Sequence, residues 1–235
     1  MDHYTTIEWK VEEMIGHLVL NQPPNNSMGN LFFKEMSDLV RNVIPKEKIN
    51  AILVYGKGRH FSSGAELKDL LQNVTENCPE HLDSQANEQP DLLIENLETF
   101  RFFNRMPIPV IAVITGVCLG AAFELALSCH IRICSERAVL GLPESSFNLL
   151  PGLGGVHYML NLTSPLKTFE IVLGGHSFTS QEALAWGVVD KVLDKKVLLD
   201  YAVRFAKFLQ GKYSQVYIKK QLSEFDKRNE KQCTH

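Results

Sequence analysis

Runs of apolar residues along this chain fall into three patterns, and each pattern predicts a different element. Short, almost uninterrupted runs at 51–55 and 109–114 end in glycines and are typical of buried parallel strands. Residues 5–20 alternate crudely and break at Gly16, which predicts an antiparallel hairpin. Across residues 28–43 the apolar side chains recur at helical spacing, so we expect an amphipathic helix there.

The second half of the chain contains a helix candidate that is apolar on most sides. Residues 119–129 are small and apolar apart from Glu124, which predicts a helix buried over most of its surface. Runs at 131–134 and 138–141 indicate strands behind it. The pattern between 177 and 210 is helical again.

Three further stretches differ in pattern from the elements described so far. A strand-like run at 187–192 interrupts the last helical region. Residues 71–92 are rich in Asn, Gln, Glu and Asp, which favours a surface loop or lid over a linker between domains. The final residues, 216–235, are strongly polar. We therefore expect the core to continue across the polar stretch.

Composition narrows the classes of function. A formal net charge of -3 gives no electrostatic footprint for nucleic acid or an anionic membrane. The five cysteines lack CxxC spacing and the eight histidines lack metal-ligand spacing, so we predict reduced thiols and no metal. Without a signal peptide or a membrane-length apolar run, we expect a cytoplasmic protein that stays off the membrane.

Glu124 is the first candidate for chemistry, because a carboxylate inside an apolar helix is costly unless it is hydrogen-bonded or functional. Burial raises the pKa of a glutamate toward neutrality, which suits a general acid or base. The alternative is a structural ion pair with an arginine such as Arg132.

Glu144 follows a predicted strand and the break at Pro143, a place where catalytic side chains are commonly presented. Taken alone, it is interpreted as a surface loop residue or a helix cap. Only together with Glu124 does it suggest two carboxylates that converge on a substrate or a water.

Backbone N–H groups are the third candidate element. The segments 61–66 and 120–122 both follow strands and open predicted helices, and helix N-termini carry free N–H groups. Two such ends aimed at one point would stabilise the negative charge that a carbonyl oxygen gains on becoming an enolate. The alternative is that the small residues only permit close packing. The glycine-rich run 152–155 lacks the lysine of a P-loop, so we interpret it as a helix-opening turn.

Four ordered segments together make the chain resemble the enoyl-CoA hydratase/isomerase, or crotonase, superfamily. Residues 56–67 look like the first oxyanion segment of that family, and residues 109–126 look like its second oxyanion strand and helix. Residues 141–155 are similar to the segment with the second glutamate, and residues 183–192 to its closing unit.

The resemblance implies an α/β fold, a crotonase-like spiral of ββα units with a C-terminal helical region. It places a core at 1–192 and a shortened helical oligomerisation segment at 193–235. Homotrimers or hexamers are implied, as are acyl thioesters carried by coenzyme A or by the phosphopantetheine of an acyl-carrier protein. No cofactor is implied beyond those groups, which belong to the substrate.

The resemblance also assigns roles within the site. Glu124 would activate the water that adds to an enoyl thioester, Glu144 would exchange a proton with Cα, and the Ala65 and Ala121 N–H groups would hold the thioester oxygen. The expected substrate-binding residues are Ser63, Gly64, Leu67, Gly120, Phe123 and Gly152.

Two departures from the family pattern leave alternatives open. Phe123 follows Gly120-Ala121-Ala122 where relatives commonly have three glycines, and its ring is expected to narrow the acyl pocket. The sequence ends at His235 without the basic tail of many relatives. A hydratase or dehydratase, a double-bond isomerase or decarboxylase as in polyketide-type pathways, and a non-catalytic partner subunit are all compatible with this sequence.

Overall fold

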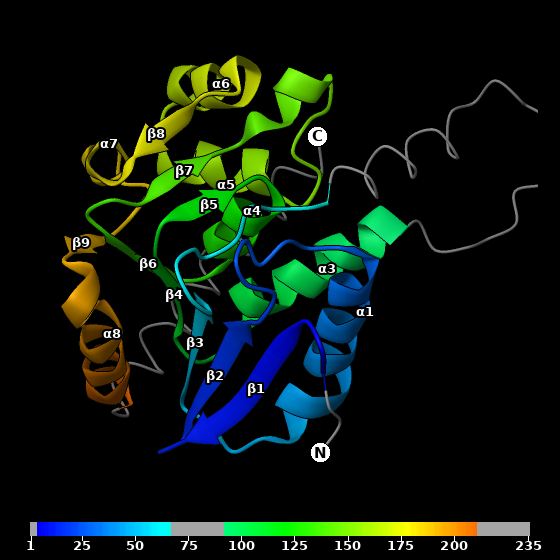
Figure 1. The fold of residues 1–235 in the computed structure, drawn as a ribbon, viewed down its shortest axis with the longest axis vertical. Helices are drawn as coiled ribbons and strands as arrows, with labels where there is room; N and C mark the ends of the chain where they lie inside the picture. Colours follow the sequence, from blue (N-terminus) through cyan, green and yellow to red (C-terminus); the bar gives the residue numbers. More distant parts are fainter. Residues whose placement is uncertain (1–3, 67–91, 211–235) are drawn as a thin grey trace, which may run out of the picture.

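Strands and helices are interspersed along the chain, singly or in short groups of one kind (Figure 1). The computed structural model describes residues 4–66 and 92–210. The strands are β1 Ile7–Glu12, β2 Ile15–Leu20, β3 Ala51–Gly56, β4 Val110–Ile114, β5 Val117–Leu119, β6 Ile131–Ser135, β7 Val139–Gly141, β8 Ser177–Thr179 and β9 Lys191–Leu193. The α-helices are α1 Asn30–Asp38, α3 Leu92–Arg105, α4 Ala121–Ser128, α5 Gly155–Leu162, α6 Pro165–Gly174, α7 Ser180–Ala185 and α8 Lys195–Leu209, with shorter helical turns η1 Leu39–Val43, η2 Ile44–Lys46 and η3 Pro143–Phe147.

Among the described residues the strands form two sheets. The larger has the order β1-β2-β3-β4-β6-β9, and the smaller has the order β5-β7-β8. In the larger sheet only the β1–β2 pair is antiparallel. In the smaller sheet β5 and β7 are parallel, and β7 and β8 are antiparallel. The predicted α/β class is confirmed, and so is the hairpin at residues 5–20.

The two central strands of the larger sheet have apolar side chains on both faces. All of β4 and the first four residues of β3 are buried, which is the pattern that the continuous apolar runs predicted. Helix α8 packs on one face, with Leu198, Ala202 and Ala206 buried in a cluster with Leu53 and Ile111. Helices α1 and α3 lie on the other side (Figure 1).

Several predicted element boundaries were wrong. The hairpin turns at residues 13–14, and Gly16, where the break was predicted, pairs with Val11 inside the ladder. The helix predicted from residue 28 begins at Asn30, because its N-cap Gly29 has extended backbone angles, with a φ of -88° and a ψ of -178°. The Met28 N–H donates to Gly64 O at 2.9 Å. The strand predicted at 187–192 begins only at Lys191. The Val188 and Val189 N–H groups both donate to Ala183 O, so these buried valines belong to the turn that ends α7.

Some of the expected organisation falls outside the described residues. The lid predicted at 71–92 is described only at Leu92, where α3 begins. The C-terminal segment predicted at 193–235 is described as far as Gln210 and contains α8, while the division at 192 stays a prediction. None of the helices formed by residues 4–66 and 92–210 has the length and apolarity needed to cross a membrane.

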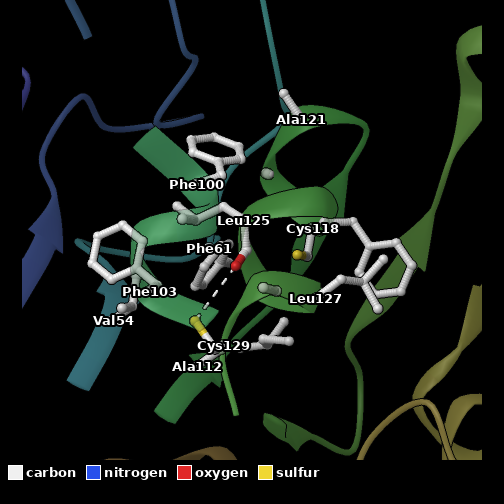
Figure 2. Packing of buried hydrophobic residues seen from close by; sticks show 14 of the residues in the cluster. Val54, Phe61, Phe100, Phe103, Ala112, Cys118, Ala121, Leu125, Leu127 and Cys129 are labelled. Carbon is white, nitrogen blue, oxygen red and sulfur yellow. Dashed lines mark hydrogen bonds between the residues drawn. The ribbon is translucent and has the colours of Figure 1, made fainter. Parts of the chain in front are cut away.

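Helix α4 lies at the centre of the main core, and all eight of its residues are buried. Figure 2 shows Leu125 of this helix beside Phe61, with Phe100 and Phe103 of α3 close by. The thiol of Cys129, just after the helix, donates to Leu125 O at 3.4 Å. Cys118, Cys129 and Cys134 are free and buried, as packing residues would be.

Phe103 and Phe208 provide a matched test of this core. Phe103 is 0% exposed, whereas Phe208 at the end of α8 is 80% exposed. We expect Phe103→Ala to lower the unfolding free energy by about 3–5 kcal/mol, because it removes a buried ring and leaves a cavity. Phe208→Ala should change it by roughly 0.5 kcal/mol or less. Urea denaturation followed by circular dichroism measures both, and similar losses in the two variants would contradict this core assignment.

Candidate active site

The ends of two neighbouring strands bring the candidate residues together. Strands β5 and β7 are parallel, and Leu119 pairs with Gly141 at their carboxyl ends. The segments that follow, Gly120 with α4 and Leu142 with η3, therefore begin side by side. The Gly120 N–H donates to Gly141 O at 2.9 Å and joins the two turns. Glu124 lies one turn into α4, and Glu144 lies at the start of η3.

Glu124 is 2% exposed, and a glycine-rich turn holds its carboxylate. Its Oε1 accepts hydrogen bonds from the Leu153 and Gly155 N–H groups, both at 2.8 Å. A Cβ atom on Gly155 would lie 2.9 Å from that oxygen, so only glycine permits this approach. The predicted helix-opening turn at 152–155 is confirmed, because Gly154 caps α5. The sequence did not predict that N–H groups of this turn bind the Glu124 carboxylate.

The alternative of a structural ion pair with Arg132 was wrong. The Arg132 guanidinium donates to Val188 O at 2.7 Å and to Cys129 O at 2.6 Å, and it lies 3.7 Å from Asp190 Oδ2. Arg132 therefore joins β6 to the turn before β9. Among the described residues no cation pairs with Glu124. Burial is therefore the main cause that raises the pKa of Glu124 from 4.5 to about 8, and repulsion from Glu144 is the second. The two N–H donors oppose this rise.

Glu144 is half-buried and points toward the start of α4. A Cβ atom on Gly120 would lie 3.0 Å from its Oε1. Its Oε2 is buried and has no hydrogen-bond partner within residues 4–66 and 92–210. Burial raises the pKa of Glu144 above its ordinary value. A buried acceptor without a partner is costly, and it marks a position where a water or a substrate group can bind.

The first candidate oxyanion donor is the Ala65 N–H, and a hydrogen bond to the carbonyl oxygen of the same peptide group sets its direction. Gly64 O accepts from the Met28 N–H at 2.9 Å, and the C=O and N–H of a trans peptide point in opposite directions. The Ala65 N–H therefore points away from Met28. A Cβ atom on Gly64 would lie 2.4 Å from Leu119 O and 3.6 Å from Ala121 N, so this peptide lies against the start of α4.

The second donor is oriented in the same way. Gly120 O accepts from the Phe123 N–H at 2.8 Å and the Glu124 N–H at 3.0 Å, which turns the Ala121 N–H outward from the helix. Gly120 has a φ of +54°, a conformation that favours glycine. Neither the Ala65 nor the Ala121 N–H donates to any residue in 4–66 or 92–210. Both are available to a carbonyl oxygen.

Comparison with known proteins identifies the family to which this site belongs. The family model described as "Enoyl-CoA hydratase/isomerase" matches residues 10–234. The chain belongs to the enoyl-CoA hydratase/isomerase family.

Individual relatives agree with this assignment. A Bacillus subtilis (strain 168) protein described as "Probable enoyl-CoA hydratase" is 32% identical over 183 residues, which cover 78% of this chain and 67% of the relative. An enoyl-CoA hydratase/isomerase from Xanthobacter autotrophicus Py2 is 25% identical with a TM-score of 0.83, covering 98% of this chain and 84% of that one. An enoyl-CoA hydratase from Bacillus anthracis matches in fold, with 22% identity and a TM-score of 0.76 over 94% of this chain and 90% of that one. The predicted crotonase fold is confirmed.

The remaining predicted site residues lie in varied surroundings. Gly152 is beside α3, where a Cβ atom on it would lie 2.9 Å from Leu93 Cδ1. Ser63 is exposed and its N–H donates to Asn25 O at 2.9 Å.

Phe123 is fully buried, and its ring lies 5.6 Å from the ring of Phe178. The structure therefore gives no support to the prediction that the Phe123 ring narrows the acyl pocket. Leu67 lies outside the described residues. Substrate contact stays a prediction for Gly152, Ser63, Phe123 and Leu67.

The described side chains were also compared with the requirements of a metal site. No group of three or more His, Cys, Asp or Glu residues is arranged to hold a metal ion within residues 4–66 and 92–210.

Gly64 and Gly58 give a matched pair for testing the close approach at the first donor. Both have positive φ, +92° and +87°, so alanine is strained at either position by about 1–2 kcal/mol. Only at Gly64 would the new methyl group meet Leu119 O; at Gly58 the nearest atom is 3.9 Å away. We expect Gly64→Ala to lower the unfolding free energy clearly more than Gly58→Ala does, in parallel urea titrations. Equal losses would show that the two peptides are not in contact.

The raised pKa of Glu124 predicts how stability depends on pH. The folded protein holds this proton more tightly than the unfolded chain, so the stabilisation is complete below pH 4.5 and is lost as the pH rises to about 8. Across that window we expect the unfolding free energy of the wild-type chain to fall relative to Glu124→Gln, by up to about 1.4 kcal/mol per pH unit. Gln keeps the acceptor for Leu153 and Gly155 but does not titrate. Parallel pH profiles for the two proteins would rule out a buried, titrating carboxylate.

Proposed function

We propose that this protein hydrates trans-2-enoyl thioesters, or catalyses the reverse dehydration of 3-hydroxyacyl thioesters. The observation that carries the proposal is a pair of carboxyl groups with raised pKa values, Glu124 and Glu144, of which the second raises the pKa of the first by charge repulsion. Glu144 Oε1 lies beside Gly120, the residue whose peptide also supplies the Ala121 N–H. A pair of carboxylates with pKa values moved toward neutrality suits the addition and removal of protons in one reaction.

In this proposal the thioester oxygen binds between the Ala65 and Ala121 N–H groups. Their positive ends stabilise the negative charge that develops on this oxygen as the enolate forms. Because both donors belong to peptide groups that are fixed at their carbonyl ends, they need little reorganisation during the reaction. This is the part of the site that any enolate-forming reaction on a thioester would use.

The two glutamates divide the proton transfers. Glu124 orients a water and accepts one of its protons as the water oxygen bonds to Cβ, while Glu144 delivers a proton to Cα. Glu124 Oε1 is occupied by two N–H donors, so its other oxygen faces the water in this scheme. The unpartnered Oε2 of Glu144 is the atom that we assign to the second transfer.

The names of the relatives support the reaction class. The matched relatives are described as an enoyl-CoA hydratase or a hydratase/isomerase, which favours a coenzyme A thioester as the substrate of this chain. We extend the proposal to a cytoplasmic lyase that assembles as a homotrimer or hexamer and carries no cofactor of its own. An acyl-carrier-protein thioester is the alternative substrate.

Substitution of the two glutamates tests the reaction. We expect Glu124→Gln and Glu144→Gln each to lower kcat by about 10²- to 10⁴-fold on crotonyl-CoA or longer enoyl-CoAs, because each removes a proton-transfer group. Loss of the enoyl-thioester absorbance measures the rate. Glu170→Gln is the control, because Glu170 is a half-exposed residue of α6 that pairs with Lys167.

Mass spectrometry of the product separates the competing reactions. Hydration adds the mass of one water, isomerisation leaves the mass unchanged, and decarboxylation lowers it. The proposal fails if coenzyme A and carrier-protein substrates are both inert, or if the product keeps the mass of the substrate. A protein that is inert on both but copurifies with a partner would be a non-catalytic subunit.

A further inference from the structure

Asn26 is a buried polar residue whose side-chain N–H groups all donate to the segment that precedes the first oxyanion donor. It is 2% exposed and sits in the turn after β2 with a φ of +49°. Its Nδ2 lies 3.0 Å from Lys57 O, 2.9 Å from His60 O and 3.1 Å from Phe61 O. Its Oδ1 accepts from the Gln22 N–H at 2.9 Å. Every polar atom of this side chain is therefore used.

The chemistry of these partners requires an amide at this position. Carbonyl oxygens only accept hydrogen bonds and a backbone N–H only donates, so the side chain needs a donor at one end and an acceptor at the other. The same pattern fixes the orientation of the Asn26 amide. An isosteric carboxylate would direct an oxygen at three carbonyl oxygens.

The backbone next to Asn26 continues this contact as far as the donor itself. The Ser63 N–H donates to Asn25 O at 2.9 Å, and the Met28 N–H donates to Gly64 O at 2.9 Å. The second of these bonds sets the direction of the Ala65 N–H, since Gly64 O belongs to the same peptide group. Residues 25–28 thus hold residues 61–66 from one side.

We propose that Asn26 is a positioning residue of the oxyanion hole, which acts through residues 25–28 on the Gly64–Ala65 peptide. The inference rests on the proposed function, because the oxyanion hole has a role only if a thioester carbonyl binds there. Loss of the Asn26 amide removes three hydrogen bonds that join residues 57–61 to the turn after β2. Residues 25–28 then shift relative to residues 61–66, and the Met28 N–H fixes the Gly64 carbonyl less firmly. The Ala65 N–H moves off the thioester oxygen.

Glycine is the substitution that isolates the side chain. Asn26→Gly tolerates the φ of +49° without strain and removes only the amide. We expect kcat to fall by about 10- to 100-fold with a smaller change in KM, because a misplaced donor weakens the transition state more than the bound substrate. The control is Ser180→Ala, which removes another buried hydrogen bond, from Ser180 Oγ to Glu136 O at 2.7 Å, away from these residues.

A spectroscopic signature separates positioning from mere support of the fold. The absorption of 4-(dimethylamino)cinnamoyl-CoA moves to longer wavelength when donors polarise its carbonyl group. We expect this shift in the wild-type protein and in Ser180→Ala, and a reduced shift in Asn26→Gly. A full shift with wild-type kcat in Asn26→Gly would overturn the proposal. So would a lower kcat explained wholly by a smaller folded fraction, with the full shift retained.

Amide hydrogen exchange, measured by NMR without any ligand, tests the structural step by itself. We expect the Met28 and Ser63 amides to exchange at least about 10-fold faster in Asn26→Gly and at the wild-type rate in Ser180→Ala. Unchanged exchange at both amides would overturn the proposal even if the enzyme were active. Faster exchange in a protein that acts on no thioester would support the positioning step and reject the proposed function.

Discussion

The site depends on the burial of one carboxylate in the core. Glu124 projects from a helix whose eight residues are all buried, and two backbone N–H groups, rather than a cation, satisfy one of its oxygens. An ion pair would hold the group ionised, whereas neutral donors only partly offset the cost of desolvation. The carboxyl group therefore titrates near neutrality, at a pKa of about 8. The glycine at position 155 follows from this arrangement, because a side chain there would displace the carboxylate.

The second constraint is the direction of two peptide groups. Each is held at its carbonyl oxygen, Gly64 by the Met28 N–H and Gly120 by the first turn of α4. The hydrogen bond to the carbonyl oxygen thus fixes the direction of the N–H in the same peptide group. Parallel pairing of β5 with β7 then brings Glu144 to the same place. The donors and the carboxylates thus lie near the carboxyl ends of β5 and β7, although their residues are spread over about eighty positions of sequence.

The sequence predicted those parts of the structure that depend on local pattern. Strands β3 and β4 were predicted because each is a short apolar run that ends in glycine, and helix α4 was predicted because its apolar run is longer. The run at 187–192 misled because a buried capping turn and a buried strand have the same apolar composition. The prediction that Arg132 pairs with Glu124 was wrong for a different reason. Its donors lie 29 and 31 positions along the chain and are backbone atoms, which no side-chain pattern reveals. The same holds for Asn26, whose contacts at 57–61 depend on tertiary folding.

The most direct test of this account is a crystal structure with a bound acyl-thioester analogue of coenzyme A. The account predicts the thioester oxygen at about 2.7–3.1 Å from both Ala65 N and Ala121 N. It also predicts a water or hydroxyl oxygen in hydrogen-bond contact with Glu124 and Glu144. A thioester oxygen bound away from either N–H, or carboxylates that turn away from the acyl group, would contradict it.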